Sequence, residues 1–196
     1  MTPKLPLDVA AWRDSERARL LDARQAIPLE THQAVSAAIM RAVADSLPAA
    51  NGEMIGCYWP IRREPDCLTF MRELMKRGGR VALPVVRARG MPLEFRIWTE
   101  STRMEAGVWN IPQPAEGSFV TPTALVVPLV GFDDAGYRLG YGGGYYDATL
   151  TSLSPRPFAV GVGLESSRLP TIYPQAQDVA MDVIVTEQRK RVFPGG

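Results

Sequence analysis

The sequence predicts an α/β fold in which a mostly parallel central sheet carries helices on both faces. Three observations support this prediction. Residues 1–50 have a residue pattern typical of helices, whereas in the rest of the chain short apolar runs alternate with helical segments. The apolar runs are bounded by glycine, proline and charged residues, as buried strands are. The order strand, crossover helix, strand then favours parallel pairing.

The N-terminal part, residues 1–50, is expected to contribute two helices to one domain spanning residues 1–196, not to fold separately. The first helix covers Leu7–Arg24, which is rich in alanine, leucine and arginine. After a break that contains a proline, Thr31 is the expected N-cap of a second helix ending near Leu47. The stretch Pro48–Gly52 would close that helix.

Six strands and two more helices are expected after residue 53. The strands, in chain order, are MIGCYW, RVALPVV, LEFRIW, ALVVPLV, FAVGVGL and DVIVT. A helix over Pro65–Gly78, with proline at its start and glycine just past its end, links the first two strands. Another, over Gly144–Leu153, lies between ALVVPLV and FAVGVGL.

The composition is that of a water-soluble globular protein, with 46% hydrophobic and 22% charged residues and a net charge of +1. Neither a membrane-spanning run nor a signal-peptide core is evident, so we expect a cytoplasmic location. The near-neutral charge gives no general attraction to nucleic acid or to membranes. We therefore expect small-molecule ligands and no obligate protein partner.

The single histidine and the two cysteines are weak candidates for chemistry. His32 lies in a helical stretch without a nearby nucleophile, and we expect it to be exposed there, which argues against a Ser-His-Asp hydrolase. Cys57 and Cys67 are not spaced as a CxxC redox pair and have too few companions for a zinc site. Any anionic ligand must be held elsewhere.

The stretch RLGYGGGYYD, Arg138–Asp147, is the strongest candidate site. It follows an expected strand and opens an expected helix, where free backbone N–H groups and the helix dipole favour an anion. Glycines let the backbone approach a phosphate, and Arg138 adds a positive charge. These features favour a nucleotide or phosphate site over the alternative, a glycine-rich connection with tyrosines packed on it. The stretch is neither a Walker A loop nor a Rossmann fingerprint.

The longer segment PLVGFDDAGYRLGYGGGYYDATL resembles the signature of the 5-formyltetrahydrofolate cyclo-ligase family, also called methenyltetrahydrofolate synthetases. Four other segments, CYWPIRRE, RVALPVV, WNIPQP and QDVAMDVIVTE, occur in the order that the family shows, so the resemblance extends across most of the chain. The resemblance implies an ATP- and Mg²⁺-dependent conversion of 5-formyltetrahydrofolate to 5,10-methenyltetrahydrofolate, with release of ADP and phosphate. It also implies that ATP first phosphorylates the formyl oxygen.

The resemblance assigns roles to individual residues. Arg138 and Tyr145 are the implied catalytic residues, and Asp147 and Asp178 the implied metal contacts. The implied ATP contacts are Arg13, Arg17, Arg138, Leu139, Gly140, Tyr141, Gly142, Gly143, Gly144, Tyr145 and Tyr146. The implied folate contacts are Arg17, Trp59, Glu64, Trp109, Tyr141, Gly142, Gly143, Gly144 and Tyr145.

Each assignment has a structural alternative. The two N-terminal arginines, four residues apart, could form a solvated basic face of a helix. Glu64 could form a loop salt bridge with Arg62 or Arg63, and either aspartate could cap a turn.

The chain also departs from the family pattern at four positions. Arg13 stands for a lysine, Gln113 for a glutamate, Gln177 for a histidine and Ser167 for a frequent glutamine. Two rival functions therefore stay open: a paralogue that binds nucleotide or folate without turnover, and a ligase of the same family with a different formylated substrate. Nucleic-acid binding through stacked aromatics is a more distant third.

Overall fold

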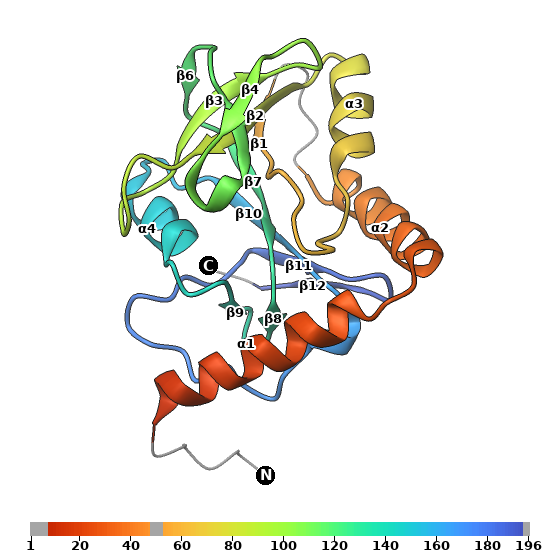
Figure 1. Cartoon of the computed structure of the whole chain (residues 1–196), viewed down its shortest axis with the longest axis vertical. Coiled ribbons are helices and arrows are strands. Elements are labelled where there is room, and N and C mark those ends of the chain that lie inside the picture. Colours follow the sequence, from red (N-terminus) through yellow and green to blue (C-terminus); the bar gives the residue numbers. More distant parts are fainter. Residues whose placement is uncertain (1–7, 48–52, 194–196) are drawn as a thin grey trace.

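The computed structural model of the protein describes residues 8–47 and 53–193, and its centre is an eight-stranded sheet in the order β12-β11-β10-β7-β1-β2-β3-β6 (Figure 1). Five adjacent strands run parallel, and strands at both edges run antiparallel. The parallel strands are β1 (Met54–Gly56), β2 (Arg80–Val85), β7 (Ala124–Pro128), β10 (Phe158–Val162) and β11 (Val183–Val185). The antiparallel strands are β3 (Glu94–Trp98), β6 (Phe119–Val120) and β12 (Lys190–Val192). The predicted mostly parallel sheet is confirmed.

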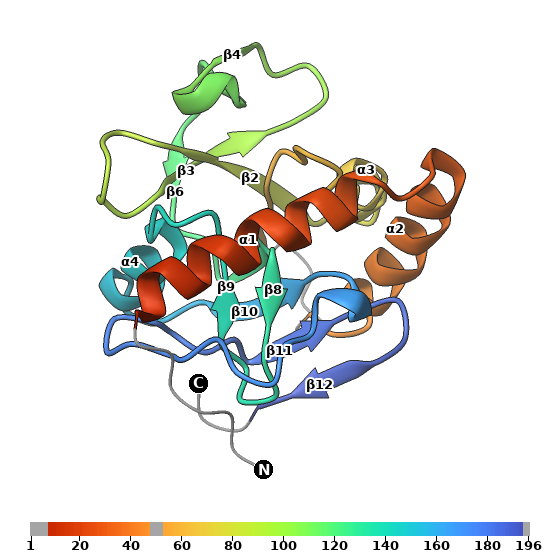
Figure 2. The ribbon, with the colours of Figure 1, turned by 60° about the horizontal axis from the view of Figure 1, so that its bottom comes forward.

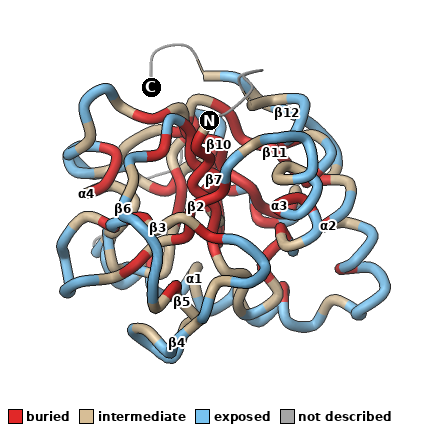
Figure 3. The backbone as a smooth tube through the Cα atoms, turned by 90° about the horizontal axis from the view of Figure 1, so that it is seen from above, coloured by how far each residue is buried: buried red, intermediate tan, exposed pale blue. Residues whose placement is uncertain are grey.

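Helices cover both faces of this sheet, as predicted (Figures 1 and 2). On one face, α2 (Leu29–Ala44) and α3 (Leu68–Lys76) pack side chains such as Ile39 and Met71 onto the central strands. On the other face, Leu150 of α4 (Tyr145–Ser152) enters a second apolar cluster. The central strands are apolar and buried along their length, which is why they lie at the red centre in Figure 3.

Helix α1 (Val9–Gln25) lies apart from the two covering layers and packs on a small hairpin (Figure 2). The hairpin consists of β8 (Gly131–Phe132) and β9 (Arg138–Leu139), and it leads from β7 into α4. Leu20 of the helix and Leu139 of the hairpin belong to the same buried apolar cluster. The Asp8 side chain caps the helix by accepting a hydrogen bond from the backbone N–H of Ala11 at 3.0 Å.

Several predicted boundaries differ from the structure. The first helix begins at Val9, and α2 begins at Leu29 with Pro28 in the N-cap position, so Thr31 lies inside the helix and the predicted cap is wrong. The fixed φ of proline suits a helix start without a side-chain cap. Helix α3 begins only at Leu68, and the predicted stretch Pro48–Gly52 lies outside the described residues.

The sequence analysis missed eight short elements of the described ranges. Six are strands of two or three residues: β4 (Met104–Ala106), β5 (Pro112–Pro114), β6, β8, β9 and β12. The other two are the short helices η1 (Val108–Asn110), between β4 and β5, and η2 (Glu165–Ser167), after β10. Strands of two or three residues carry too little alternation to be recognised in a sequence. None of the helices in the described ranges is long and apolar enough to cross a membrane.

The direction of winding reverses between β1 and β7. From β1 the chain passes to β2 on one side, whereas β7 is followed by β10 and β11 on the other side. Ligands of open α/β sheets bind beyond the carboxyl ends of the strands at such a reversal. The topology therefore predicts a ligand-binding site among the residues that follow β1 and β7.

Candidate active site

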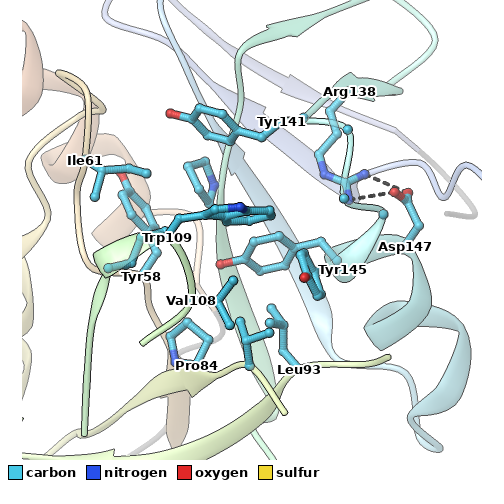
Figure 4. Close-up of a pocket in the computed structure, with 18 of the residues that line it drawn as sticks. Tyr58, Ile61, Pro84, Leu93, Val108, Trp109, Arg138, Tyr141, Tyr145 and Asp147 are labelled. Atoms are coloured by element: carbon cyan, nitrogen blue, oxygen red, sulfur yellow. Dashed lines mark hydrogen bonds and ion pairs between the residues drawn. The ribbon is translucent and has the colours of Figure 1, made fainter. Parts of the chain in front are cut away.

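A cavity of about 320 Å³ lies where the winding reverses (Figure 4). Tyr58 and Trp59 line it just after β1, Pro84 at the end of β2, and Pro128 at the end of β7. Every residue that the sequence analysis assigned to ATP, folate or metal also lines it. The structure thus brings together groups from α1, the β1–α3 connection, η1, the glycine loop and the segment around Asp178.

The glycine loop, Gly140–Gly144, connects β9 with α4 and needs glycine for its shape. Gly142 has φ +92° and Gly144, the N-cap residue of α4, has φ +65°. Both values lie in the left-handed region, which residues with a side chain rarely adopt. The loop therefore presents its backbone and the N-terminus of α4 to the cavity, a geometry suited to an anion.

Arg17 of α1 lies against this loop. Its Nε donates a hydrogen bond to the carbonyl oxygen of Gly140 at 2.8 Å, and its Nη1 is paired with Asp14. A Cβ built on Gly142 would lie 3.6 Å from the guanidinium carbon of Arg17. The positive charge and the open side of the loop therefore face the same space.

Arg138 and Asp147 form a bidentate ion pair at the loop (Figure 4). Arg138 Nη1 donates to Oδ1 of Asp147 at 2.8 Å, and Nη2 donates to Oδ2 at 3.0 Å. The arginine is buried, and its guanidinium also lies 5.8 Å from the ring centroid of Tyr146. The predicted phosphate-binding arginine and a predicted metal ligand thus neutralise each other.

Arg13, an expected ATP contact, and Asp178, the other expected metal contact, are also joined by an ion pair. Arg13 Nη2 donates to Oδ2 of Asp178 at 2.5 Å and to the carbonyl oxygen of Tyr173 at 2.9 Å, and Nε donates to the carbonyl oxygen of Ile172 at 2.9 Å. Arg13 therefore ties α1 to the C-terminal segment that carries Asp178. Val179 in turn donates its N–H to Oδ1 of Asp147 at 3.0 Å, which brings the two aspartates close together.

Among the described residues, the two carboxylates available to a metal ion at this side of the cavity are those of Asp147 and Asp178. No group of three or more His, Cys, Asp or Glu side chains in residues 8–47 and 53–193 could hold one. Mg²⁺ commonly takes one or two carboxylates, keeps several waters and completes its shell with substrate phosphates. Asp147 and Asp178 fit that donor set, provided that a phosphate ligand lies beside them.

At the other side of the cavity, Glu64 is buried with 3% of its surface exposed. Its Oε2 accepts a hydrogen bond from the backbone N–H of Ile61 at 2.9 Å. Burial raises the pKa of this carboxyl to about 7, although the Ile61 N–H, the Arg24 charge and the Tyr141 hydroxyl lower it in part. The carboxylate does not form the alternative loop salt bridge with Arg62 or Arg63.

Aromatic rings line the cavity beside this carboxyl. Trp109 is 64% exposed and has φ +54°, a costly backbone conformation for a large residue. Its ring meets Tyr145 edge to face, with centroids 5.8 Å apart and an interplanar angle of 77°, and both rings lie over the cavity in Figure 4. With Trp59 nearby, they provide flat apolar surfaces for a planar ligand.

The sequence analysis missed an apolar wall of the cavity formed by side chains from β2, the β2–β3 loop and the η1 segment. Its residues are Pro84, Val86, Leu93, Val108, Ile111 and Pro112. Apolar residues carry no distinctive motif, but Pro84 and Val86 could have been found from their place at the end of a parallel strand.

His32 corrects another expectation, because it is buried, not exposed. Its Nε2 lies 3.1 Å from the carbonyl oxygen of Arg63 and 2.9 Å from that of Glu64. Beside two carbonyl oxygens this nitrogen must carry the proton and donate. A histidine on α2 therefore supports the turn that ends at Glu64.

Of the remaining residues that depart from the family pattern, two line the cavity. Gln113 donates from Nε2 to Oε1 of Glu105 at 3.2 Å, and Gln177 lies next to Asp178. Ser167 lies outside this cavity and is buried, donating from Oγ to the carbonyl oxygen of Leu164 at 2.7 Å. Its role in the structure is therefore local.

The reversed winding, the glycine loop with its flanking arginines and the aromatic cavity together define an α/β enzyme whose site suits an anionic ligand next to a flat one. Residues 9–187 match the model of the 5-formyltetrahydrofolate cyclo-ligase family. The chain belongs to this family and is therefore a ligase.

Relatives and solved structures agree with this assignment. The chain is 30% identical to the 5-formyltetrahydrofolate cyclo-ligase of Mycolicibacterium smegmatis over 88% of this chain and 92% of that protein. It is 24% identical to the Mus musculus protein of that name over 87% and 91% of the two chains. The NMR structure of Aquifex aeolicus 5,10-methenyltetrahydrofolate synthetase superposes with a TM-score of 0.80 and 28% identity, over 94% of each chain.

Proposed function

We propose that the protein converts 5-formyltetrahydrofolate to 5,10-methenyltetrahydrofolate, using ATP and Mg²⁺ and releasing ADP and phosphate. The single observation that carries the proposal is that one cavity joins a glycine loop flanked by arginines to a buried carboxyl and aromatic rings. Two different ligands that must react with each other need such a continuous site.

The reaction asks the protein for positioning and charge neutralisation. The formyl oxygen attacks the γ-phosphorus of ATP, and the bond from that phosphorus to ADP breaks. The neighbouring folate nitrogen then attacks the activated carbon and loses its proton, and phosphate leaves with the former formyl oxygen. No protein nucleophile is required, and the cavity lining supplies arginines, N–H groups and carboxylates.

In this proposal the glycine loop, Arg17 and Arg138 hold the phosphates of ATP. The open backbone of Gly142 and the N-terminus of α4 donate N–H groups, and the two guanidiniums offset the phosphate charge. Tyr145, the first residue of α4, lies between this loop and Trp109, where the two ligands would meet.

The pterin would lie at Glu64. A pterin edge carries several N–H donors, which a buried carboxyl can accept from, and its flat rings suit the aromatic surfaces of Trp59 and Trp109. Asp147 and Asp178 would hold Mg²⁺ next to the ATP phosphates. The ion, when bound, neutralises charge on the phosphates during transfer.

An optical assay tests the proposal. The protein is incubated with 5-formyltetrahydrofolate, ATP and Mg²⁺, and the absorbance of the methenyl product is followed, with ATP or Mg²⁺ omitted as controls. Product that requires both supports the proposal. Binding of ATP and folate without product would instead favour a binding protein, and turnover of another formylated compound alone would favour the second ligase function.

A further inference from the structure

Glu64 lies at the end of a turn that the backbone does not favour by itself. Arg62 and Arg63 have φ values of +45° and +55°, two successive side-chain-bearing residues in the left-handed region. The turn closes through a hydrogen bond from the N–H of Glu64 to the carbonyl oxygen of Ile61 at 2.8 Å. Such a conformation persists only where the surroundings hold it.

Side chains from the first two helices hold this turn by its carbonyl groups. Arg24 Nε donates to the carbonyl oxygen of Arg62 at 3.0 Å, and His32 Nε2 donates to those of Arg63 and Glu64. The carbonyl groups of three consecutive residues therefore accept hydrogen bonds from α1 and α2. The carboxyl of Glu64 is left to face the cavity.

Arg24 also reaches the glycine loop. It is buried, with 4% of its surface exposed, and Nη2 donates to the hydroxyl oxygen of Tyr141 at 2.5 Å, while Nη1 donates to the carbonyl oxygen of Leu129 at 3.2 Å. The Tyr141 hydroxyl in turn lies close enough to the carboxyl of Glu64 to lower its pKa. One guanidinium thus links the turn that presents Glu64, the end of β7 and the glycine loop.

We propose that Arg24 is a positioning residue that holds the Glu64 carboxyl and the Tyr141 hydroxyl in fixed relation, so that the flat substrate binds in register with the glycine loop. This inference rests on the proposed function and extends it to a residue outside the cavity lining. Arginine suits the task because its planar guanidinium donates from three separate nitrogens, whereas a lysine donates all its hydrogen bonds from one.

Arg24 also acts on the protonation of Glu64. Its charge and the Tyr141 hydroxyl both lower the pKa of that carboxyl, against the larger effect of burial. The other groups that face Glu64 are Arg62 of the same turn, Tyr58 after β1, Cys67 before α3, and Tyr146 of α4. The tyrosines and the cysteine stay neutral near pH 7, so Arg24 and Arg62 are the charges that counter burial.

The test compares Arg24→Met and Arg24→Lys with a control, Arg191→Met. Arg191 is also held in an ion pair, with Glu165, and is mostly shielded from solvent, but it lies outside the cavity. We measure KM for 5-formyltetrahydrofolate, kcat, and Kd for ATP with Mg²⁺. In parallel, ¹³C NMR of the carboxyl, assigned with Glu64→Gln, follows the titration of Glu64 without substrate.

Arg24→Met is expected to raise KM by about tenfold while Kd for ATP changes less than about twofold, and to move the Glu64 midpoint to higher pH. Arg24→Lys keeps the positive charge but loses the planar guanidinium. The titration midpoint of Glu64 should therefore return toward the wild-type value, while KM for 5-formyltetrahydrofolate stays raised. Arg191→Met should lower thermal stability alone. The same KM and the same midpoint as wild type in a folded Arg24→Met protein would overturn the proposal.

Two further outcomes are decisive. If Arg24→Met does not fold, Arg24→Lys decides, because a lysine variant with the wild-type KM would show that the planar guanidinium is not needed. If the wild-type protein turns over no 5-formyltetrahydrofolate, the proposed function fails. The NMR midpoint then still tells whether Arg24 controls Glu64.

Discussion

Arg138 and Asp147 are joined by two parallel hydrogen bonds of 2.8 and 3.0 Å, with both side chains largely out of solvent. A phosphate that binds Arg138 must compete with this carboxylate, and a cation that binds Asp147 must compete with the guanidinium. Metal and nucleotide should therefore assist each other, because each releases the partner that the other needs.

Asp147→Asn tests this coupling. The amide keeps the shape but removes the charge, so Arg138 is free to bind phosphate, and metal-free ATP should bind about tenfold more tightly than to wild type. Stimulation of ATP binding by Mg²⁺ should be lost. Calorimetric titration with ATP, with Mg²⁺ and with a chelator, measures both. Unchanged metal-free affinity would show that the ion pair does not restrain Arg138.

Arg13→Lys should destabilise the protein, although lysine is the residue that resembles the family pattern. The substitution loses hydrogen bonds to the carbonyl oxygens of Ile172 and Tyr173 and weakens the pair with Asp178. A cost of about 2–4 kcal/mol in the free energy of unfolding is expected, since buried acceptors lose their donors. Urea denaturation measures it, and wild-type stability would contradict the role of Arg13 as a clamp.

Gly142→Val should weaken ATP binding more than it weakens folding. Valine at φ +92° is strained by about 1–3 kcal/mol, and its side chain would extend toward Arg17. The matched control is Gly78→Val, because Gly78 has φ +85°, has no neighbour within 4 Å of a built Cβ and lies outside the cavity. Equal loss of ATP affinity in both variants would mean that strain, not the loop surface, is responsible.

Glu64 should make stability depend on pH. Its folded-state pKa of about 7 lies above the unfolded value of 4.5, so its contribution is complete below about pH 4.5 and is lost as the pH rises through 7. The loss amounts to about 3 kcal/mol from the two pKa values. Glu64→Gln should remove this slope, so the variant gains stability relative to wild type between pH 5 and 7.5 in chemical denaturation. If the free energy of unfolding depended on pH in the same way in wild type and in Glu64→Gln, the raised pKa of Glu64 would be refuted.

The parts of the fold that could be predicted are those that depend on local pattern. The run ALVVPLV is apolar throughout because β7 is covered on both faces, and the glycine loop has a motif of its own. The parts that could not be predicted depend on contacts with distant backbone. Arg24 bonds carbonyl groups 38 and 105 residues away, and His32 bonds residues 31 and 32 away, so hydrophobic periodicity says nothing of their burial.

The pairing within the site was equally hidden. The sequence analysis assigned Arg138 to phosphate and Asp147 to metal separately, because nothing in a linear sequence shows that a loop folds one onto the other. The apolar wall around Leu93 and Ile111 depends on strands of only a few residues, whose side-chain pattern is too short to read.

Three of the four arginines of helix α1, Arg13, Arg17 and Arg24, each bond a different segment of the chain. Their spacings of four and seven residues place them along one side of the helix. Each helical residue advances by about 100°, so one residue inserted between Arg17 and Arg24 would turn the third arginine away from its partners without changing any of the three. The length of this helix between its arginines is therefore as much a requirement of the site as the arginines themselves.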